Sequence, residues 1–242
     1  MDKYSIAGIS VGYDAKYDML RSRSVPYISE DERPVQVSIT VDHNELEKSL
    51  PEYPLLDIQT LEYMRVGSLF YTALLDLGGF LLHASAVVAD GVAYCFSAPS
   101  GTGKSTHTSL WLDTFADKGA YIINDDKPAI KLVDGVPYVY GTPFSGKYDI
   151  SVNTAAPLKA VCFIERSQVN SIKRITPFKA ATMILDQTIR PDDEARMDKL
   201  FENIEAVVTS VPSYVLSCNI SRDAAILAYN EMSGKNAFET QN

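Results

Sequence analysis

Residues 98–106 read APSGTGKST and bring two glycines, a lysine and several hydroxyl side chains into one short segment. Glycine lets a chain curl until successive backbone N–H groups converge on one anion, and a helix that begins at the lysine directs its positive end to the same place. The ammonium of Lys104 could then neutralise phosphate oxygens, and the hydroxyl of Ser105 could bind a Mg²⁺ ion that bridges two phosphates. The predicted phosphate-binding residues are Ser100, Gly101, Thr102, Gly103, Lys104, Ser105 and Thr106.

The neighbours of this loop support the prediction. An apolar run over residues 92–97 precedes it and a helical pattern over residues 104–115 follows it, which is the strand–loop–helix context that a P-loop requires. One position departs from the pattern G-x-x-x-x-G-K-[ST], because Ala98 stands where the first glycine belongs and alanine has a narrower range of backbone angles. A fortuitous glycine turn before a helix is the alternative interpretation. His107, one turn into the helix, is expected to face neighbouring surface rather than phosphate.

Acidic residues follow the next apolar run. Residues 120–123 predict a strand, and residues 124–126 (NDD) come at its carboxyl end, where open α/β sheets bind their ligands. One carboxylate there could bind the Mg²⁺ ion directly or through its water, and a second carboxylate beside it could take the proton from an incoming hydroxyl. A plain β-turn is the alternative, because aspartate and asparagine favour turns.

The remaining pattern predicts the elements that must position these groups. Two apolar runs flank Asp90-Gly91 and a second hairpin is expected at Asp134-Gly135, since Asp-Gly between apolar runs is a strong hairpin signal. Strands in hairpins together with helices predict an α/β chain with a mixed sheet rather than a regular βαβ series. The predicted helices are residues 57–77, 104–115, 180–187, 194–208 and 221–232, and the predicted strands are residues 80–88, 92–97, 120–123, 158–164 and 214–218.

The N-terminal part of the chain is less regular. Short alternating runs over residues 4–9 and 35–41 predict strands, and the polar segment 21–33 between them predicts a loop. We interpret residues 1–57 as a small β-rich N-terminal cap and residues 58–242 as the domain that carries the phosphate-binding loop.

The composition restricts the partners and the compartment. Apolar residues make up 46% and charged residues 22% of the chain, and the formal net charge is 22 − 31 = −9. Nucleic acid is therefore not an expected partner, because a duplex-binding surface needs clustered lysine and arginine. The apolar stretch 69–89 is interrupted by Asp76, a glycine pair and His83, so no membrane partner is expected. The N-terminus lacks a secretion signal and three isolated cysteines lie in apolar runs, which together predict a cytoplasmic protein with reduced core thiols.

Three segments together resemble the catalytic domain of HPr kinase/phosphorylase, a bacterial P-loop serine kinase whose nucleotide fold is shared with ATP-dependent phosphoenolpyruvate carboxykinase. They are residues 82–85 (LHAS), residues 97–106 (SAPSGTGKST) and residues 122–126 (IINDD), which occur in the family's order and at similar intervals. The resemblance covers about residues 78–165 and implies a mixed-sheet P-loop kinase core.

The resemblance also implies roles for single residues. It implies that Lys104 binds the phosphates of ATP, that Ser105 and Asp125 bind Mg²⁺, and that Asp126 is the general base. By its own surroundings His83 is more typical of a core side chain, but the resemblance implies that it organises the carboxylate of Asp126.

The implied activity is that of a Mg²⁺-dependent kinase, which transfers the γ-phosphate of ATP to a serine hydroxyl of a protein or peptide or to a small-molecule alcohol. Residues 142–147 (TPFSGK) are similar to a loop that closes over the transferred phosphate, with a surface turn as the alternative. Related enzymes are oligomers, so a homo-oligomer is also implied. The glycine- and arginine-rich loop of the bifunctional enzyme is missing, and residues 1–57 do not resemble its N-terminal domain, so the acceptor stays open.

Two alternatives belong to other classes. The chain could be a non-catalytic nucleotide-binding regulator or an accessory protein of a biosynthetic cluster. It could also act on a dicarboxylate as a carboxykinase does, which would require substrate-binding arginines. The candidate arginines are scattered along the sequence: Arg65, Arg166, Arg174 and Arg190.

Overall fold

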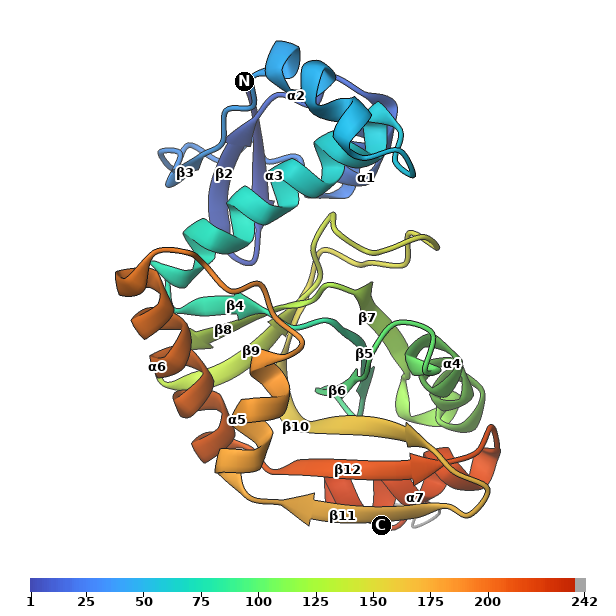
Figure 1. Cartoon of the computed structure of the whole chain (residues 1–242). Helices are drawn as coiled ribbons and strands as arrows, with labels where there is room; N and C mark the ends of the chain where they lie inside the picture. Colours follow the sequence, from blue (N-terminus) through green and yellow to red (C-terminus); the bar gives the residue numbers. More distant parts are fainter. Residues whose placement is uncertain (238–242) are drawn as a thin grey trace.

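The computed structural model of the chain describes residues 1–237, which form a small N-terminal sheet and a large mixed sheet (Figure 1). The small sheet has three strands, β1 (Asp2–Ile6), β2 (Ile9–Tyr13) and β3 (Val37–Ser38). The helices around it are α1 (Asp18–Ser24), α2 (His43–Ser49) and the long α3 (Ile58–Leu75), with 3₁₀ turns η1 (Val25–Tyr27) and η2 (Leu50–Glu52).

The large sheet contains nine strands and mixes parallel with antiparallel pairs, which confirms the mixed α/β architecture predicted from the sequence. Strand β10 pairs in parallel with both β6 and β12, whereas the hairpins β5–β6 and β8–β9 are antiparallel. Seven of its strands are hydrogen-bonded in the order β4 (Gly79–Leu81), β8 (Ala129–Val133), β9 (Val136–Tyr140), β10 (Ala155–Arg166), β6 (Val92–Ser97), β5 (Ala84–Ala89) and β7 (Tyr121–Asp126). The other two extend the sheet from β10, because β12 (Ser213–Cys218) pairs with β10 and also with β11 (Ser171–Ile175).

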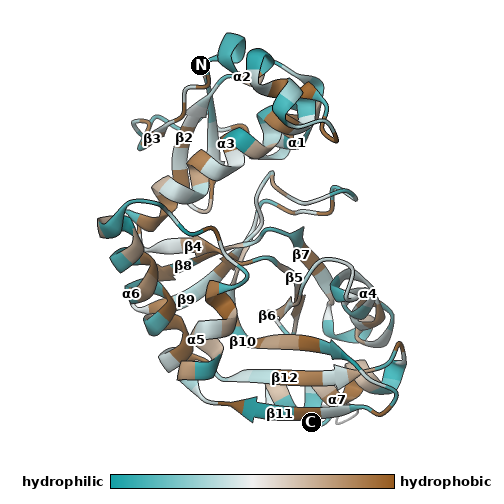
Figure 2. Cartoon of the chain, viewed as in Figure 1, coloured by the Kyte–Doolittle hydropathy of each residue, from teal (hydrophilic) through white to brown (hydrophobic). Residues whose placement is uncertain are grey.

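Helices cover both faces of this sheet (Figure 1). On one face α5 (Pro177–Leu185) and α6 (Glu194–Ser210) bury side chains such as Ile184 and Ile204 against the strands. On the other face α4 (Lys104–Thr114), followed by η3 (Ala116–Lys118), packs with α7 (Arg222–Ser233). Figure 2 shows hydrophobic stretches on β10 and β12 between these layers, and burial of such apolar surface is the main driving force for the fold.

The apolar run over residues 80–88 was predicted as one strand, and that prediction is wrong. The structure divides it into β4 and β5, with Leu82 and His83 in the link. The two strands have different partners, because β4 pairs with β8 whereas β5 lies between β6 and β7. Both parts are buried, so hydrophobicity alone could not reveal the break. His83 is therefore in a connection rather than within a strand.

The N-terminal predictions need two corrections. Residues 4–9 are not one strand, because Ala7 and Gly8, with φ of 53° and 71°, form the turn between β1 and β2. Residues 21–33 are not all loop, because α1 extends to Ser24. The helix α2 was not predicted either, although Asp42 caps it by accepting hydrogen bonds from two backbone N–H groups.

The two predicted Asp-Gly hairpins are confirmed. Both Asp-Gly turns have positive φ at the two central residues, as a two-residue hairpin of type I′ requires. All three cysteines are buried and none forms a disulfide. No helix within residues 1–237 is both long enough and apolar enough to cross a membrane.

Candidate active site

The predicted phosphate-binding residues lie in the segment between β6 and α4 and in the first turn of α4. Gly101 and Gly103 have φ of 78° and 124°, which L side chains rarely adopt, and a Cβ at either position would have nothing within 4 Å. The glycines are therefore required by backbone conformation rather than by space. Ala98, where the sequence pattern has its first glycine, is buried and has no positive φ, so alanine fits there without strain.

The N-terminus of α4 differs from those of most other helices in the chain. Gly103 is at the N-cap position, and no side chain among the described residues caps α4. Its first N–H groups therefore have no helical or side-chain partner, and the helix dipole adds positive potential at the same place. Five helices (α2, α3, α5, α6 and α7) instead have side-chain caps, namely Asp42, Asp57, Thr176, Asp193 and Ser221.

Lys104 is buried at the start of α4, with only 8% of its surface exposed. Its Nζ donates a hydrogen bond to the carbonyl of Ala98 at 2.9 Å and lies 3.0 Å from Nε2 of His83. Burial lowers the pKa of Lys104, while the nearby carboxylates of Asp126 and Asp125 act in the opposite direction. The ammonium is thus held by the protein beside the open end of the helix.

Ser105 and Asp125 form an oxygen pair in the same region. The Ser105 hydroxyl donates to Oδ1 of Asp125 at 2.9 Å, and Asp125, at the end of β7, is only 4% exposed. Hydroxyl and carboxylate oxygens are ligands that Mg²⁺ accepts, and neighbouring ligands in an octahedron with metal–oxygen distances of about 2.0–2.1 Å lie about 2.9 Å apart. The pair therefore fits Mg²⁺. No group of three or more His, Cys, Asp or Glu side chains that could hold a metal ion occurs among residues 1–237.

The side chains of Asp126 and His83 are in contact. Oδ1 of Asp126 is 3.2 Å from Nε2 of His83, and Nδ1 of His83 is 3.1 Å from Oε1 of Gln187. When His83 is neutral with its proton on Nδ1, Nε2 accepts a hydrogen bond from Lys104; when the ring is protonated, Nε2 donates to Asp126. His83 thus connects the ammonium of Lys104 to the carboxylate of Asp126.

The backbone and charge of Asp126 are both unusual. Its φ of 134° is rare for a residue with a side chain, and such conformations often occur at functional sites. Burial acts to raise the pKa of Asp126, but the hydrogen bond with His83 and the ammonium of Lys127 outweigh it and lower the pKa to about 2. Lys127 forms an ion pair with Oδ2 of the same carboxylate. Asp126 is therefore an ionised carboxylate at neutral pH.

The segment after β9 closes against Asp126. At Gly146, which has a φ of 71°, a Cβ would lie 2.8 Å from the Cβ of Asp126 and 3.2 Å from the carbonyl oxygen of Asp125. The amide of Asn124 donates to the carbonyl of Thr142 at 3.1 Å, which fixes the start of this segment to β7. The predicted loop over residues 142–147 therefore packs on the acidic end of β7.

The N-terminal elements hold this loop from the other side. The N–H of Gly146 donates to the hydroxyl of Tyr63 on α3 at 3.3 Å, and the guanidinium of Arg23 lies over the Tyr63 ring at 4.8 Å. Arg23 also pairs with Asp149 at 3.5 Å. The N-terminal elements and α3 therefore support this loop without lining the cavity beside it.

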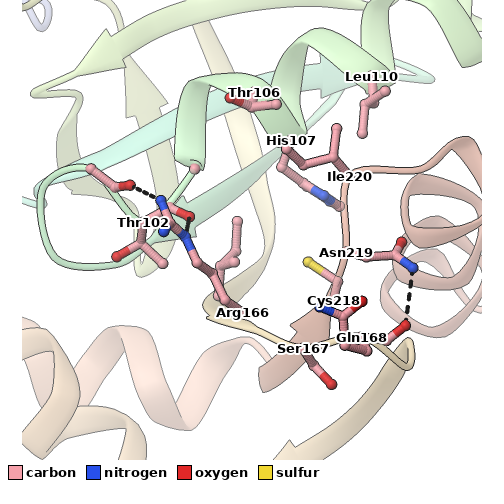
Figure 3. Close-up of a pocket in the computed structure, with 13 residues that line it drawn as sticks. Thr102, Thr106, His107, Leu110, Arg166, Ser167, Gln168, Cys218, Asn219 and Ile220 are labelled. Atoms are coloured by element: carbon pink, nitrogen blue, oxygen red, sulfur yellow. Dashed lines mark hydrogen bonds between the residues drawn. The ribbon is translucent and has the colours of Figure 1, made fainter.

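Two cavities flank the glycine-containing loop. The first, the charged cleft, has a volume of about 460 Å³. Its lining residues are His83, Ser100, Gly101, Gly103, Lys104, Ser105, Thr106, Asp125, Asp126, Gly146, Lys147 and Tyr148. The second, the side cavity, has a volume of about 690 Å³ and lies between α4 and the carboxyl ends of β10 and β12 (Figure 3). Gly101, Gly103 and Thr106 line both cavities.

The structure brings nearly all the predicted site residues to the charged cleft, including His83, Lys104, Ser105, Asp125 and Asp126. The exception is Thr102, which lines the side cavity. His107 does not face the surface as predicted; it is 3% exposed, and burial lowers its pKa to about 4.

For three residues at the site, no role in binding or orienting groups there was predicted from the sequence. Gln187 contacts His83 from 104 positions away, and Lys127 pairs with Asp126. Arg166 donates through Nε to the carbonyl of Thr102 at 3.0 Å and through Nη2 to the carbonyl of Gly101. Of the four scattered arginines, Arg166 is the one that lines either cavity. A basic residue at the carboxyl end of a buried strand was the available signal for Arg166, whereas Gln187 had none.

Comparison with known proteins finds a matching family model and several distantly similar solved structures. The model of the family described as "SynChlorMet cassette protein ScmC" matches residues 53–223. A search of curated proteins finds no match. The solved structure of the Hpr(Ser) kinase/phosphatase from Coxiella burnetii is similar with 12% identity and a TM-score of 0.39, covering 64% of this chain and 97% of that one. A likeness of this degree is too weak to establish a shared activity.

Proposed function

We propose that this chain, which belongs to the SynChlorMet cassette protein ScmC family, is a Mg²⁺-dependent phosphotransferase that moves the γ-phosphate of ATP to a hydroxyl group. One observation carries the proposal: in one cleft the uncapped end of α4 and the ammonium of Lys104 meet the oxygen pair of Ser105 and Asp125, with the Asp126 carboxylate nearby. Anion-binding groups, metal-binding oxygens and a carboxylate for the acceptor are the parts that phosphoryl transfer needs.

The loop and helix would bind the phosphate chain. Free N–H groups at the start of α4 donate to phosphate oxygens, and Lys104 adds a positive charge that is already positioned by the carbonyl of Ala98. Because these groups do not have to reorganise during the reaction, they can stabilise charge as it develops on the transferred group. Mg²⁺ bound at Ser105 and Asp125 would supply further neutralisation of the phosphate oxygens.

Asp126 would orient the acceptor. Its carboxylate is ionised, so it accepts a hydrogen bond from an incoming hydroxyl and directs the hydroxyl oxygen toward the phosphate. Phosphoryl transfer passes through a loose transition state in most analyses, so orientation contributes more than the strength of the base. His83 positions Asp126 through Oδ1, and Gln187 positions His83 in turn.

The ion pair between Lys127 and Asp126 favours a second candidate. With Oδ2 paired to an ammonium, an acceptor hydroxyl must share or displace that contact. A nucleotide-binding regulator or accessory protein without turnover would have no such requirement. The two functions differ in whether label leaves the nucleotide.

The test is a transfer assay with the full chain, Mg²⁺ and γ-labelled ATP. Serine- and threonine-containing peptides and small-molecule alcohols serve as acceptors, and both nucleotide loss and label transfer are followed. We expect label on at least one hydroxyl acceptor and none without Mg²⁺. Binding of ATP with neither nucleotide loss nor transfer supports the regulator, and absence of binding to any di- or triphosphate contradicts both candidates.

A further inference from the structure

The side cavity is joined to the charged cleft through the loop, yet the residues that form the rest of its wall are of a different kind. Leu110, Ile164 and Ile220 supply apolar surface, and Gln168 and Asn219 supply amide groups (Figure 3). Among its described lining residues none has a carboxylate. At about 690 Å³ the cavity is within the range of small-molecule sites, which combine apolar walls with a few polar groups.

The charge of the side cavity is confined to its border with the loop. Arg166 is the lining residue with a full positive charge, and it is held by the carbonyls of Gly101 and Thr102. A ligand with a neutral, partly apolar body and an anionic end therefore matches the cavity if the anionic end lies at the loop. A nucleoside with phosphates attached has this form.

His107 adds a hydrogen-bond donor to the wall of the side cavity. The indole N–H of Trp111 can only donate, and it lies 3.1 Å from Nε2 of His107, so Nε2 must be the acceptor. The proton of the neutral ring is then on Nδ1. Nδ1 is buried and has no hydrogen-bond partner among the described residues, and a buried donor without a partner is costly. In Figure 3 the His107 ring extends from α4 toward Ile220 and Asn219.

From this arrangement we infer that the side cavity binds the nucleoside of the nucleotide whose phosphates lie on the loop, and that the Nδ1–H of His107 donates to an acceptor atom of that nucleoside. The acceptor is a ring nitrogen of the base or an oxygen of the ribose. The inference rests on the proposed function, because it assigns the phosphates to the loop between the two cavities. It gives His107 a role in nucleoside recognition and none in phosphate binding.

The test compares ATP with inorganic tripolyphosphate, which has the phosphates and no nucleoside. Calorimetric titration of the full chain with Mg²⁺ is expected to give a Kd for ATP that is lower than that for tripolyphosphate by about tenfold or more. Equal affinities would overturn the inference while leaving the proposed function intact. Absence of binding by either compound would overturn the proposed function and the inference with it.

Two variants of His107 separate its two nitrogens. In His107→Gln the side-chain oxygen can still accept from Trp111, but the Nδ1 donor is lost; we expect ATP to bind about two- to tenfold more weakly, with tripolyphosphate unchanged. In His107→Asn the amide can replace the Nδ1 donor, but Trp111 loses its acceptor; we expect a lower melting temperature and an unchanged ratio of the two Kd values.

A third variant places a larger side chain in the side cavity and leaves His107 unsubstituted. Leu110→Trp is expected to weaken the binding of ATP and leave the binding of tripolyphosphate unchanged. Ser109→Trp, on the same helix but outside the lining of either cavity, is expected to change neither Kd. If ATP binds to Leu110→Trp and His107→Gln as tightly as to the unmodified chain, the nucleoside does not occupy the side cavity.

Discussion

The charged cleft and the side cavity share two glycines of one loop and Thr106 at the start of α4, but they differ in almost everything else. The cleft contains His83, two carboxylates and two lysines, whereas the side cavity contains Arg166, a neutral His107 and apolar or amide side chains. Charged groups are effective when they are held where charge changes during a reaction, and neutral walls suit a part of a ligand that does not react. The glycine-containing loop can thus place the reacting part of a ligand in the charged cleft and the part that is only recognised in the side cavity.

The difference can be traced to the elements that supply each wall. The end of β7 brings the carboxylates of Asp125 and Asp126 to one side of the glycine-containing loop, and the segment around Gly146 packs on them. On the other side, β10 contributes Ile164 and the segment after β12 contributes Ile220. The predictions that follow separate the two regions, because variants in the cleft should alter transfer and variants at the side cavity should alter nucleotide affinity.

The largest effect is expected for Lys104→Met. Removing the buried ammonium leaves the phosphate oxygens without their lysine partner, so transfer should fall by about 10³-fold or more. Label transfer from γ-labelled ATP measures it. Lys131→Met, which removes another partly buried lysine outside both cavities, should keep transfer within about twofold. Comparable transfer in both variants would contradict the proposed role of Lys104.

Asp126→Asn should lower transfer by about 10²- to 10³-fold while ATP affinity changes little, because the amide cannot accept a hydroxyl proton. The same labelled assay, with calorimetric Kd values beside it, separates the two effects. Asp76→Asn removes an exposed carboxylate that pairs with Lys199 and serves as the control. A variant that binds ATP much more weakly but transfers at the normal rate would move Asp126 from acceptor orientation to nucleotide binding.

A smaller effect, about tenfold on transfer, is expected for Gly146→Ala. The added Cβ would meet that of Asp126 at 2.8 Å and displace the carboxylate. Gly135→Ala is the matched control, since its φ of 79° is similar and nothing lies within 4 Å. Both variants should lose about 1 kcal/mol of unfolding free energy, because alanine is strained at a positive φ and glycine is not. Denaturant titration measures this loss. If both also lose transfer equally, the contact with Asp126 is not the cause.

Arg166→Gln should weaken ATP binding by a few fold, because the loop loses two hydrogen bonds to its carbonyls at an exposed site. Calorimetry with ATP measures the change, and the transfer rate at saturating ATP should stay close to normal. Arg174→Gln, an exposed arginine on β11, is the control. A loss of transfer at saturating ATP would instead assign Arg166 to the reacting region.

The smallest effect is a change in thiol reactivity. Cys218 is 8% exposed and lines the side cavity, whereas Cys95 and Cys162 are fully buried. Iodoacetamide should therefore alkylate Cys218 before the other two cysteines. Bound ATP should lower the rate of this alkylation severalfold, whereas tripolyphosphate should leave the rate unchanged. Burial raises the pKa of the Cys218 thiol above its ordinary value of 9.0, so the rate should keep rising as the pH passes that value. Peptide mass spectrometry identifies the modified cysteine, and equal protection by both compounds would contradict nucleoside binding there.

Local signals in the sequence were sufficient for several elements. The two Asp-Gly hairpins, the glycine loop and the start of α4 could be predicted because their conformations depend on a few adjacent residues. Helix α1 and the turn at Ala7 and Gly8 could not, because their residues carry weak local preferences and are held by packing with α3 and the small sheet.

The sequence by itself determined which groups are available: a loop that exposes backbone N–H groups, a lysine, a serine and neighbouring aspartates, in an order that local structure largely dictates. The tertiary structure decided how they meet. It broke the strand at His83, brought Gln187 to that ring across 104 positions, and set Gly146 against Asp126. These contacts depend on sheet pairing and loop packing between distant segments, and no local pattern encodes which distant partner a side chain will find.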